Sequence, residues 1–416
     1  KPFLYGLAFD RGYTPASILA DVARTYQTAT GPYHPRNYDR TTHGPVRARE
    51  ALASSYNIPA VELANDVGAP SLLETLHLAG FSSLDRSAEH YGLGLALGNG
   101  DVTLVELANG YRALANGGVW RPYRWRASDA GDTAPATSGH RLMSTASAAL
   151  VLDILGDAEA RIPGFGLETP FDFPFPVAVK TGTSRHFTDN WAAATTGNFT
   201  VAVWVGNFNG RPMDGVSGVT GAGPLLRRAV LLTSQRVAPG VLPTPASVGA
   251  TAVEICRVSG LRAGAECPRL VEWFAPGKAP RVECDWHRDG RTVLPARFAE
   301  WAASEDRGLR IEDRGHRITD RGSRIADRGA DRDSAAAPAA FRIVSPKNGD
   351  RYRVPPGVDP RFSSVGLVAV GADVRDVRWF IDGRRAVDAR FHLTGGRHTI
   401  EAIARGDSSR VTVEVY

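Results

Sequence analysis

The stretch Val179-Lys180-Thr181-Gly182-Thr183-Ser184 decides how the rest of this sequence is interpreted. An apolar run, Pro176 to Val179, leads into it and predicts a strand that carries a cation, a hydroxyl and a bare backbone into a cleft. Because Gly182 has no side chain, another chain can approach the strand closely at this point. The tripeptide Lys-Thr-Gly recurs by chance, so its weight depends on partner residues elsewhere in the chain.

The 416-residue chain is long enough for two or three domains with ordinary hydrophobic cores. Apolar residues make up 43% of it and charged residues 22%, which is typical of globular proteins. The net charge of +5 is small for this length, and no cluster of basic and aromatic residues indicates binding to nucleic acid. Three cysteines are too few to staple a fold of this size.

The chain begins at Lys1 without an initiator methionine or a leader, and no run of about 18 apolar residues could cross a membrane. Since the first residues already have the composition of a hydrophobic core, we expect the sequence to be a piece that lacks its natural N-terminus. The absence of a targeting segment therefore gives no information on the compartment.

The first 235 residues have the pattern of an α+β domain, in which helices precede an antiparallel sheet and a closing helix. Asp101 and Ser144 occupy positions typical of helix N-caps. The predicted helices cover 1–30, 46–54, 59–68, 71–79, 102–116, 145–155 and 224–235, and the predicted strands cover 177–180, 191–195 and 200–205.

Beyond this first domain, 1–235, the composition changes three times. Residues 236–300 form a linker and a small module that contains the cysteines. Residues 301–340 hold four Asp-Arg-Gly repeats at seven-residue spacing, with too few apolar residues for a coiled coil, and we expect a disordered or weakly ordered linker. Short alternating strands with Gly and Asp turns over 341–416 predict a small β-sandwich.

The segment Ser55-Tyr56-Asn57 lies at a predicted break between two helices, before Pro59. A Ser and an Asn two residues apart in such a break can both point into a cleft, where the hydroxyl relays a proton and the amide binds a substrate amide. The alternative is ordinary capping of the helix that begins at Pro59.

The first residues supply a third feature. Lys1-Pro2-Phe3-Leu4-Tyr5-Gly6 resembles the sequence that starts with the Lys of the Ser-x-x-Lys nucleophile motif in class A penicillin-binding proteins. Lys1 would then be the Lys of that motif, and the nucleophilic Ser would lie three residues earlier, outside this chain. The alternative is that Lys1 is an arbitrary starting residue.

Other motifs occur in the order expected for the same family. Residues 1–235 resemble the transpeptidase domain of a class A penicillin-binding protein, most closely of the penicillin-binding protein 1C type. Residues 341–416 resemble the β-rich C-terminal domain of that type. The resemblance implies the penicillin-binding/β-lactamase-like serine transpeptidase fold, an antiparallel sheet with a helical subdomain. The motifs are Asn57-Ile58-Pro59-Ala60-Val61, Tyr91-Gly92-Leu93-Gly94-Leu95-Ala96-Leu97-Gly98, Leu107-Ala108-Asn109-Gly110-Tyr111, Lys180-Thr181-Gly182-Thr183-Ser184, Asp189-Asn190-Trp191, Val203-Trp204-Val205-Gly206-Asn207 and the segment Gly215 to Ala222.

The resemblance implies catalytic roles for Lys1, Ser55, Asn57 and Lys180. The absent Ser would attack the penultimate D-Ala carbonyl of a peptidoglycan stem peptide, and Lys1 would take its proton. Ser55 would pass a proton to the leaving D-Ala amine, and Asn57 would position the substrate amide. Lys180 would place positive charge near the substrate carboxylate.

The resemblance implies that Thr181, Gly182 and Thr183 bind the substrate. The two hydroxyls would hydrogen-bond its carboxylate, and the backbone N–H at Thr183 would donate to the oxyanion. A β-lactam would acylate the same Ser, and no metal or cofactor is required.

The resemblance also implies a setting at the periplasmic face of the bacterial inner membrane. The expected partners are peptidoglycan stem peptides, β-lactams, the membrane through a missing N-terminal anchor, and other cell-wall synthesis proteins. The full-length protein would also carry a peptidoglycan glycosyltransferase domain upstream, and this chain without the nucleophilic Ser would be inactive.

Two other functions stay open. In a D,D-carboxypeptidase or β-lactamase-like hydrolase of the same fold, water would replace the acceptor amine, although the sequence offers no assignable general base for it. A non-catalytic fragment would instead bind peptidoglycan or a partner through the C-terminal β-domain.

Cys256, Cys267, Cys284 and His287 form a separate group with the spacing Cys-x10-Cys-x16-Cys-x2-His. Three Cys and one His are a legitimate ligand set for zinc, although the first spacing is wider than in the usual close Cys pair. One disulfide with a free thiol is the second interpretation, and three reduced structural thiols are the third.

Overall fold

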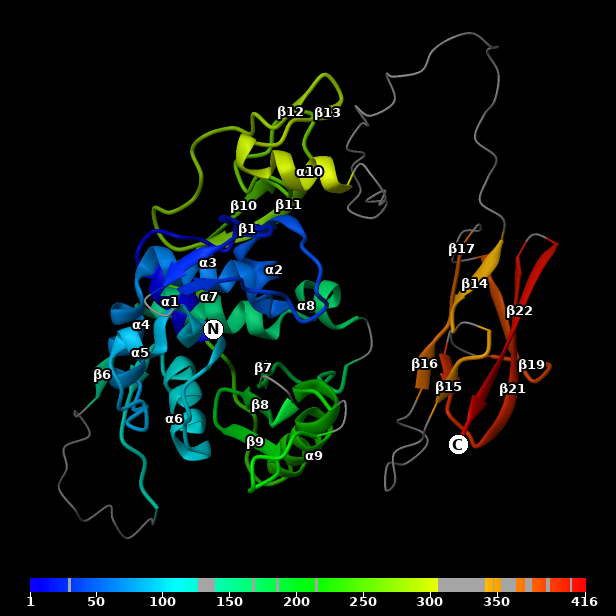
Figure 1. Cartoon of the computed structure of the whole chain (residues 1–416), viewed down its shortest axis with the longest axis horizontal. Helices are drawn as coiled ribbons and strands as arrows, with labels where there is room; N and C mark the ends of the chain where they lie inside the picture. Colours follow the sequence, from blue (N-terminus) through cyan, green and yellow to red (C-terminus); the bar gives the residue numbers. More distant parts are fainter. Residues whose placement is uncertain are drawn as a thin grey trace. The chain divides into compact units, whose positions relative to one another are not determined.

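The computed structural model describes residues 1–28, 31–125, 139–166, 169–184, 187–213, 216–305, 341–346, 348–352, 364–370, 376–386, 390–404 and 406–416 (Figure 1). The chain forms two compact units, Lys1–Arg324 and Ile325–Tyr416, and each is described by itself. Nearly all of the predicted repeat linker, from residue 306 to 340, lies outside the described residues.

Helices build the core of the first unit. The helix α1 (Pro2–Asp10) is apolar along almost its whole length, so it is buried on most sides, with Leu4 and Tyr5 fully enclosed. It packs against the equally apolar α7 (Thr145–Gly156). The remaining helices of this region are α2 (Ala48–Ala53), α3 (Ile58–Val67), α4 (Ala69–Leu78), α5 (Ala88–Tyr91), η1 (Gly92–Leu97), α6 (Leu104–Ala115) and α8 (Ala158–Phe165). No helix in the described part of the chain is both long and apolar enough to cross a membrane.

The predicted N-cap at Ser144 is confirmed, because its hydroxyl accepts a hydrogen bond from the backbone N–H of Ser147. The predicted N-cap at Asp101 is wrong. Thr103 caps α6 instead, since its hydroxyl and the Glu106 carboxylate form a reciprocal capping box.

The prediction of helix throughout residues 1–30 is wrong after α1. The chain turns at Arg11 and enters strand β1 (Ile18–Asp21), which pairs antiparallel with β4 (Gly44–Arg47). The apolar run at Ile18 and Leu19 is too short to give a helix a buried face. Pairing with β4 satisfies the hydrogen-bonding groups of the backbone instead. Two shorter pairs accompany it: β2 (Tyr26–Thr28) with β3 (Gly31–Tyr33), and β5 (Val119–Trp120) with β6 (His140–Arg141).

The predicted antiparallel sheet is present. Strands β7 (Ala178–Thr183), β8 (Asp189–Thr195) and β9 (Thr200–Gly206) follow one another in the sheet, and β8 and β9 form a hairpin. The π-helical turn η4 (Gly218–Ala222) and helix α9 (Gly223–Ser234) pack on this sheet, as expected for the closing helix (Figure 1). Helical region and sheet together give the α+β fold.

The cysteine-containing segment belongs to the first unit and packs on its helical region. Its elements are η5 (Ala246–Val248), β10 (Thr251–Cys256), β11 (Arg269–Phe274), β12 (His287–Arg288), β13 (Arg291–Thr292), η6 (Ala296–Phe298) and α10 (Ala299–Glu305). The buried Glu272 of β11 binds the guanidinium of Arg49 on α2, with Nη2 and Oε1 2.6 Å apart. Buried charges in proteins are paired in this way, so the contact fixes the segment on the helical region.

The elements described in the second unit are β-strands. Five of them form one sheet in the order β15-β22-β21-β18-β19, and β14 with β17 and β16 with β20 form two further pairs. Ile343, Phe391, Ile400 and Val413 belong to a common core, which fits the predicted sandwich. The bounds are β14 (Arg342–Ser345), β15 (Arg351–Tyr352), β16 (Ser364–Gly366), β17 (Val368–Val370), β18 (Arg378–Ile381), β19 (Arg384–Arg385), β20 (Arg390–His392), β21 (Gly396–Ala404) and β22 (Asp407–Val415).

Candidate active site

Four predicted site residues meet at the junction of the helical region and the β7–β9 sheet. Lys1 precedes α1, Ser55 and Asn57 lie between α2 and α3, and Lys180 lies on β7. The Lys1 ammonium donates to Asn57 Oδ1 at 2.6 Å, to the Ser55 carbonyl at 2.7 Å and to Ser55 Oγ at 3.3 Å. Lys180 Nζ reaches the same Ser55 Oγ at 2.7 Å, so one hydroxyl joins the two ammonium groups.

Ser55 has an unusual backbone. Its φ of 60° is in the left-handed region, which a residue with a Cβ adopts at a cost of about 1–3 kcal/mol. Contacts on both sides hold it there: Ser54 Oγ donates to the Ala160 carbonyl at 3.0 Å, and the Tyr56 ring stacks on His43 with centroids 4.1 Å apart. Strained residues of this kind cluster at functional sites.

Asn57 is held by a second polar layer. Asn37 Oδ1 accepts the backbone N–H of Asn57 at 2.8 Å and that of Ile58 at 3.2 Å. The Asn37 amide in turn donates to both carboxylate oxygens of the buried Asp21, at 2.8 Å each. The Asn57 side chain makes no capping hydrogen bond to α3, so the capping role that was the alternative for this residue is not observed. Its Oδ1 instead accepts a hydrogen bond from Lys1.

Two lysines concentrate positive charge in this group, and both have lowered pKa values. Burial lowers the pKa of Lys1 well below its usual value, and the Lys180 charge lowers it further. Burial also lowers the pKa of Lys180 to about 7, and Arg161 on α8 adds to the effect. In the described residues no carboxylate forms a salt bridge with either lysine. A lysine that loses its proton near neutral pH can serve as a base.

The predicted substrate-binding residues lie at the exposed end of β7. Within the described residues β7 pairs only with β8, so its other edge has no strand partner there. Thr183 is exposed, and its Oγ1 accepts the backbone N–H of Gly218 at 2.9 Å.

Two backbone segments approach each other closely at Gly218, where η4 lies over β7. A Cβ on Gly218 would clash with the carbonyl oxygen of Gly182 and would lie 2.9 Å from that of Trp191. Gly182 itself is less crowded, since a Cβ there would stand 3.4 Å from the nearest atom. The need for a bare backbone is therefore greater on η4 than on the strand.

The structure thus brings together Lys1, Ser55, Asn57 and Lys180, with Thr181 to Thr183 continuing along the strand. Three neighbours had not been predicted: Asp21 and Asn37, which support Asn57, and Arg161, which lies near Lys180. The loop before residue 45 is rich in polar residues, which was the only sequence signal for Asn37.

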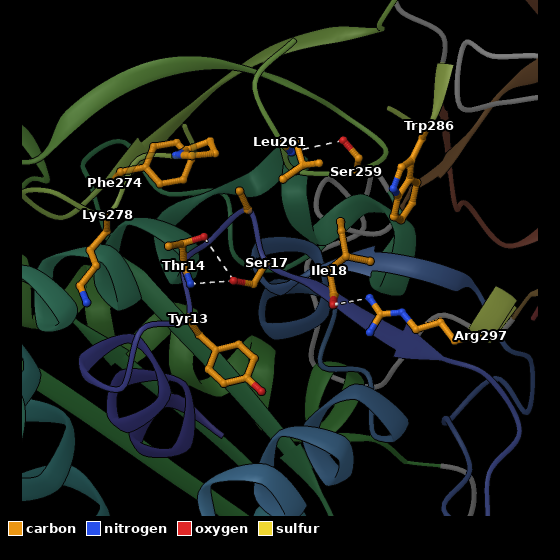
Figure 2. Close-up of a pocket in the computed structure, with 13 residues that line it drawn as sticks. Tyr13, Thr14, Ser17, Ile18, Ser259, Leu261, Phe274, Lys278, Trp286 and Arg297 are labelled. Carbon is orange, nitrogen blue, oxygen red and sulfur yellow. Dashed lines mark hydrogen bonds between the residues drawn. The ribbon is translucent and has the colours of Figure 1, made fainter. Parts of the chain in front are cut away.

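A separate cavity of about 420 Å³ lies elsewhere, between the start of β1 and the cysteine-containing segment (Figure 2). Tyr13, Ser17 and Ile18 line one side of it, and Phe274 and Trp286 line the other. None of the residues predicted for the active site contributes to it.

Comparison with known families agrees with this geometry. Residues 1–210, half of the chain, match the family described as "Penicillin binding protein transpeptidase domain". Residues 246–289 match "Penicillin-binding protein 1A, C-terminal domain", and residues 330–413 match "Penicillin-Binding Protein C-terminus Family". The class that the fold and the cleft define is therefore the transpeptidase domain of penicillin-binding proteins.

Individual relatives give the same result. Penicillin-binding protein 1C of Escherichia coli (strain K12) is 33% identical over 318 residues, 75% of this chain and 39% of the relative. Penicillin-binding protein 1A of Clostridium botulinum (strain Langeland) is 28% identical over 219 residues, 51% of this chain and 26% of the relative. The chain belongs to the penicillin-binding protein family, as the sequence motifs predicted, and it spans less than half the length of these curated relatives.

Solved structures show the same fold. The crystal structure of penicillin-binding protein 1A from Haemophilus influenzae aligns with a TM-score of 0.56 at 22% identity, covering 68% of this chain and 48% of the other. The penicillin-binding protein PonA1 from Mycobacterium tuberculosis aligns with a TM-score of 0.50 at 19% identity, covering 64% and 73%. The prediction of an α+β penicillin-binding fold is confirmed.

Proposed function

We propose that the cleft of Lys1, Ser55, Asn57 and Lys180 carries out serine-type D,D-transpeptidation of peptidoglycan stem peptides. The observation that carries the proposal is the Ser55 hydroxyl, which accepts hydrogen bonds from two lysines, both with lowered pKa values. Such an arrangement can take up a proton at one amine and deliver it at a neighbouring point without a metal or cofactor.

The nucleophile in this proposal is a Ser three residues before Lys1 in a longer chain. If α1 continues backwards, that residue lies one turn away on the same helical face as Lys1. Neutral Lys1 takes the proton of this Ser as its Oγ forms a bond to the penultimate D-Ala carbonyl carbon. The carbonyl π-electrons move to the oxygen, and a backbone N–H at the end of β7 stabilises the oxyanion.

Collapse of this intermediate breaks the C–N bond to the terminal D-Ala. The leaving nitrogen takes a proton from the Ser55 hydroxyl, and Ser55 regains one from Lys1. The Thr181 and Thr183 hydroxyls and the Lys180 ammonium hold the substrate carboxylate, while the Asn57 amide orients the substrate peptide.

The amine of a second stem peptide then attacks the acyl-enzyme. Its nitrogen forms the new amide bond to the carbonyl carbon as the bond from that carbon to the Ser Oγ breaks, and its proton passes to Lys1 through the same relay. Lys1 then returns this proton to the departing Ser Oγ, so the Ser hydroxyl and neutral Lys1 are both restored. In the described residues no carboxylate hydrogen-bonds Lys1, Ser55 or Lys180. The described part of the site thus offers no carboxylate base for attack by water, which supports transfer over hydrolysis.

The family implies the wider setting of this proposal. The full-length protein would act at the periplasmic face of the inner membrane, with an N-terminal anchor and a peptidoglycan glycosyltransferase domain upstream. It would bind β-lactams, which acylate the same Ser, and it would work beside other cell-wall synthesis proteins. We further propose the domain limits 1–235, 236–300, 301–340 and 341–416.

The proposal is tested on a chain extended upstream to include the residues before Lys1. Incubation with a fluorescent penicillin should label this chain covalently, and Lys180→Ala should abolish the label. Lys278→Ala is the matched control, because Lys278 is an exposed lysine of the cysteine-containing segment. Labelling that survives Lys180→Ala at the wild-type rate would contradict the proposal.

A further inference from the structure

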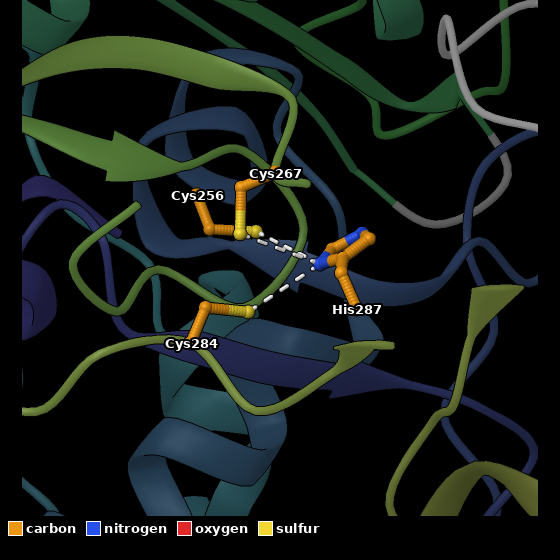
Figure 3. A group of neighbouring side chains, drawn as sticks. All are labelled: Cys256, Cys267, Cys284 and His287. Carbon is orange, nitrogen blue, oxygen red and sulfur yellow. Dashed lines mark hydrogen bonds between the residues drawn. The ribbon is translucent and has the colours of Figure 1, made fainter. Parts of the chain in front are cut away.

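A second convergent group lies in the segment that packs on the helical region. Cys256, Cys267, Cys284 and His287 turn one ligand atom each toward a common point, and these four atoms all lie within 4.8 Å of one another (Figure 3). The three cysteines of the chain are all free thiols in the structure. The disulfide considered from the sequence is therefore not present in this structure.

The spacing inside this group fits a tetrahedral metal. The Nδ1 atom of His287 lies 3.6 Å from the sulfurs of Cys256 and Cys267 and 3.4 Å from that of Cys284. In a tetrahedral zinc site, bonds of about 2.3 Å to sulfur and about 2.0–2.1 Å to nitrogen place the two ligand atoms about 3.5 Å apart. All three sulfurs therefore stand where a shared zinc ion would put them relative to the imidazole.

Each sulfur also accepts a backbone N–H. Ser259 donates to Cys256 at 3.5 Å, Gly264 donates to Cys267 at 3.3 Å, and Trp286 donates to Cys284 at 3.4 Å. Donors of this kind stabilise the negatively charged thiolate, which is the form that binds metals. This surrounding layer is an observation independent of the positions of the sulfurs themselves.

Local turns bring the ligands together. Cys256 ends β10, and the chain then turns back so that the Gly260 N–H donates to the Cys256 carbonyl at 2.9 Å. His287 begins a hairpin whose turn residues, Asp289 and Gly290, both have positive φ values, as a type I′ turn requires. The sequence spacing between Cys256 and Cys267 is wide for a zinc site. The turn after Cys256 and the backbone N–H groups that donate to the two sulfurs nevertheless hold these thiols close together.

We propose that Cys256, Cys267, Cys284 and His287 bind one structural Zn²⁺ ion through three thiolates and Nδ1. Tetrahedral sites of three sulfurs and one nitrogen select zinc, and four protein ligands leave no position for a substrate or water. This proposal is independent of the transpeptidase activity proposed above.

The ion would fix the segment on the helical region. Cys284 packs with Trp286 and Phe298 around Ala20 of β1. A Cβ on Gly260 would clash with the carbonyl oxygen of Ala16, so the turn after Cys256 lies directly on the chain that enters β1. Cys284 and the turn after Cys256 therefore both lie against β1 or the chain that enters it, and loss of the metal should loosen this contact.

The test uses the full chain, purified under reducing conditions without added zinc. We expect one zinc per chain by mass spectrometry of the metal, and three thiols that react once the protein is denatured. X-ray absorption should show three sulfurs and one nitrogen around the metal. Replacement by Co²⁺ should give the visible absorption of a tetrahedral cobalt–thiolate site.

Variants locate the site. Cys267→Ser and His287→Ala should each lose the bound zinc, whereas Arg288→Ala, an exposed neighbour on the same hairpin, should keep it. A folded chain that carries a disulfide and no zinc would overturn the proposal. Zinc that is bound only through oxygen and nitrogen would also overturn it. The absorption spectrum is measured on the unaltered chain, so the test remains valid even if a variant fails to fold.

Discussion

The active-site cleft and the cysteine group are built in contrasting ways. In the cleft, Ser55 and Lys180 meet across 125 residues of sequence, so only the completed fold can bring them together. In the cysteine group, Cys256 and His287 are 31 residues apart and are joined by local turns. The first depends on the core of the whole unit, and the second depends mainly on its own loops.

The cleft and the cysteine group also differ in their charges. The cleft holds two lysines that no carboxylate of the described residues pairs with, and both pKa values are lowered as a result of burial. The cysteine group offers a complete ligand set in which every sulfur also accepts an N–H. Lysines with lowered pKa values, beside a strand edge that no strand of the described residues pairs with, can carry out proton transfer on a substrate. A metal ion whose four coordination positions are all taken by protein ligands can only stabilise the fold.

The largest effect should follow the loss of the base in the cleft. In a chain extended before Lys1, Lys1→Ala should slow acylation by a β-lactam by about 10²–10⁴-fold, the usual contribution of a general base. Stopped-flow or time-resolved labelling measures the rate. A rate that stays within a factor of two of the wild type would remove Lys1 from the mechanism.

Removal of the metal should affect stability more than chemistry. Cys267→Ser or a zinc chelator should destabilise the first unit by about 3 kcal/mol, which lowers its Tm by about 5 °C for a unit of roughly 300 residues. Calorimetry measures the shift, with Arg288→Ala as the control. Complete loss of β-lactam labelling at a temperature where the unit remains folded would contradict the claim that the metal site acts on stability and not on catalysis.

The polar layer under Asn57 should have a smaller effect. Asn37→Ala leaves the N–H groups of Asn57 and Ile58 and the Asp21 carboxylate without this partner, at a cost of about 1–3 kcal/mol. Acylation should slow about tenfold while its pH profile keeps its shape, because the lysines are unchanged. Denaturant unfolding and labelling at several pH values test both points, and a shifted pH profile would show that Asn37 acts on the lysines directly.

The smallest effect at neutral pH should come from the titration of Lys180. Its pKa of about 7 in the folded chain lies below the unfolded value of about 10.4, so between these values the unfolded chain binds the additional proton. Stability of the wild type relative to Lys180→Met should therefore rise by about 1 kcal/mol per pH unit from pH 7 to 10. Urea unfolding of both proteins, with Lys278→Met as control, measures this slope, and a flat difference would mean that Lys180 keeps its proton.

Much of the cleft could be predicted from the sequence because its residues occur in short ordered motifs. Lys180, Ser55 and Asn57 each stand at a recognisable break or strand, and the structure places them within hydrogen-bond reach. The sheet of β7 to β9 and the helix after it also follow from apolar patterning.

Other features depend on contacts that no local pattern contains. Residues 18–21 form a strand because β4 pairs with them, and Asp21 and Asn37 matter only because α3 begins beside them. Arg161 lies near Lys180 because α8 packs against α2. The Cys group could be recognised by composition, but the free thiols and their similar distances to His287, 3.4–3.6 Å, are what distinguish a metal site from a disulfide.

The most direct test of the central claim is the site of acylation. The chain extended upstream of Lys1 is treated with benzylpenicillin, digested and mapped by mass spectrometry. We predict one penicilloyl group per chain, attached to a Ser three residues before Lys1, and none on that Ser in the Lys1→Ala variant within the same time. An adduct on Ser55, or no adduct at all on a folded chain, would contradict the proposed mechanism.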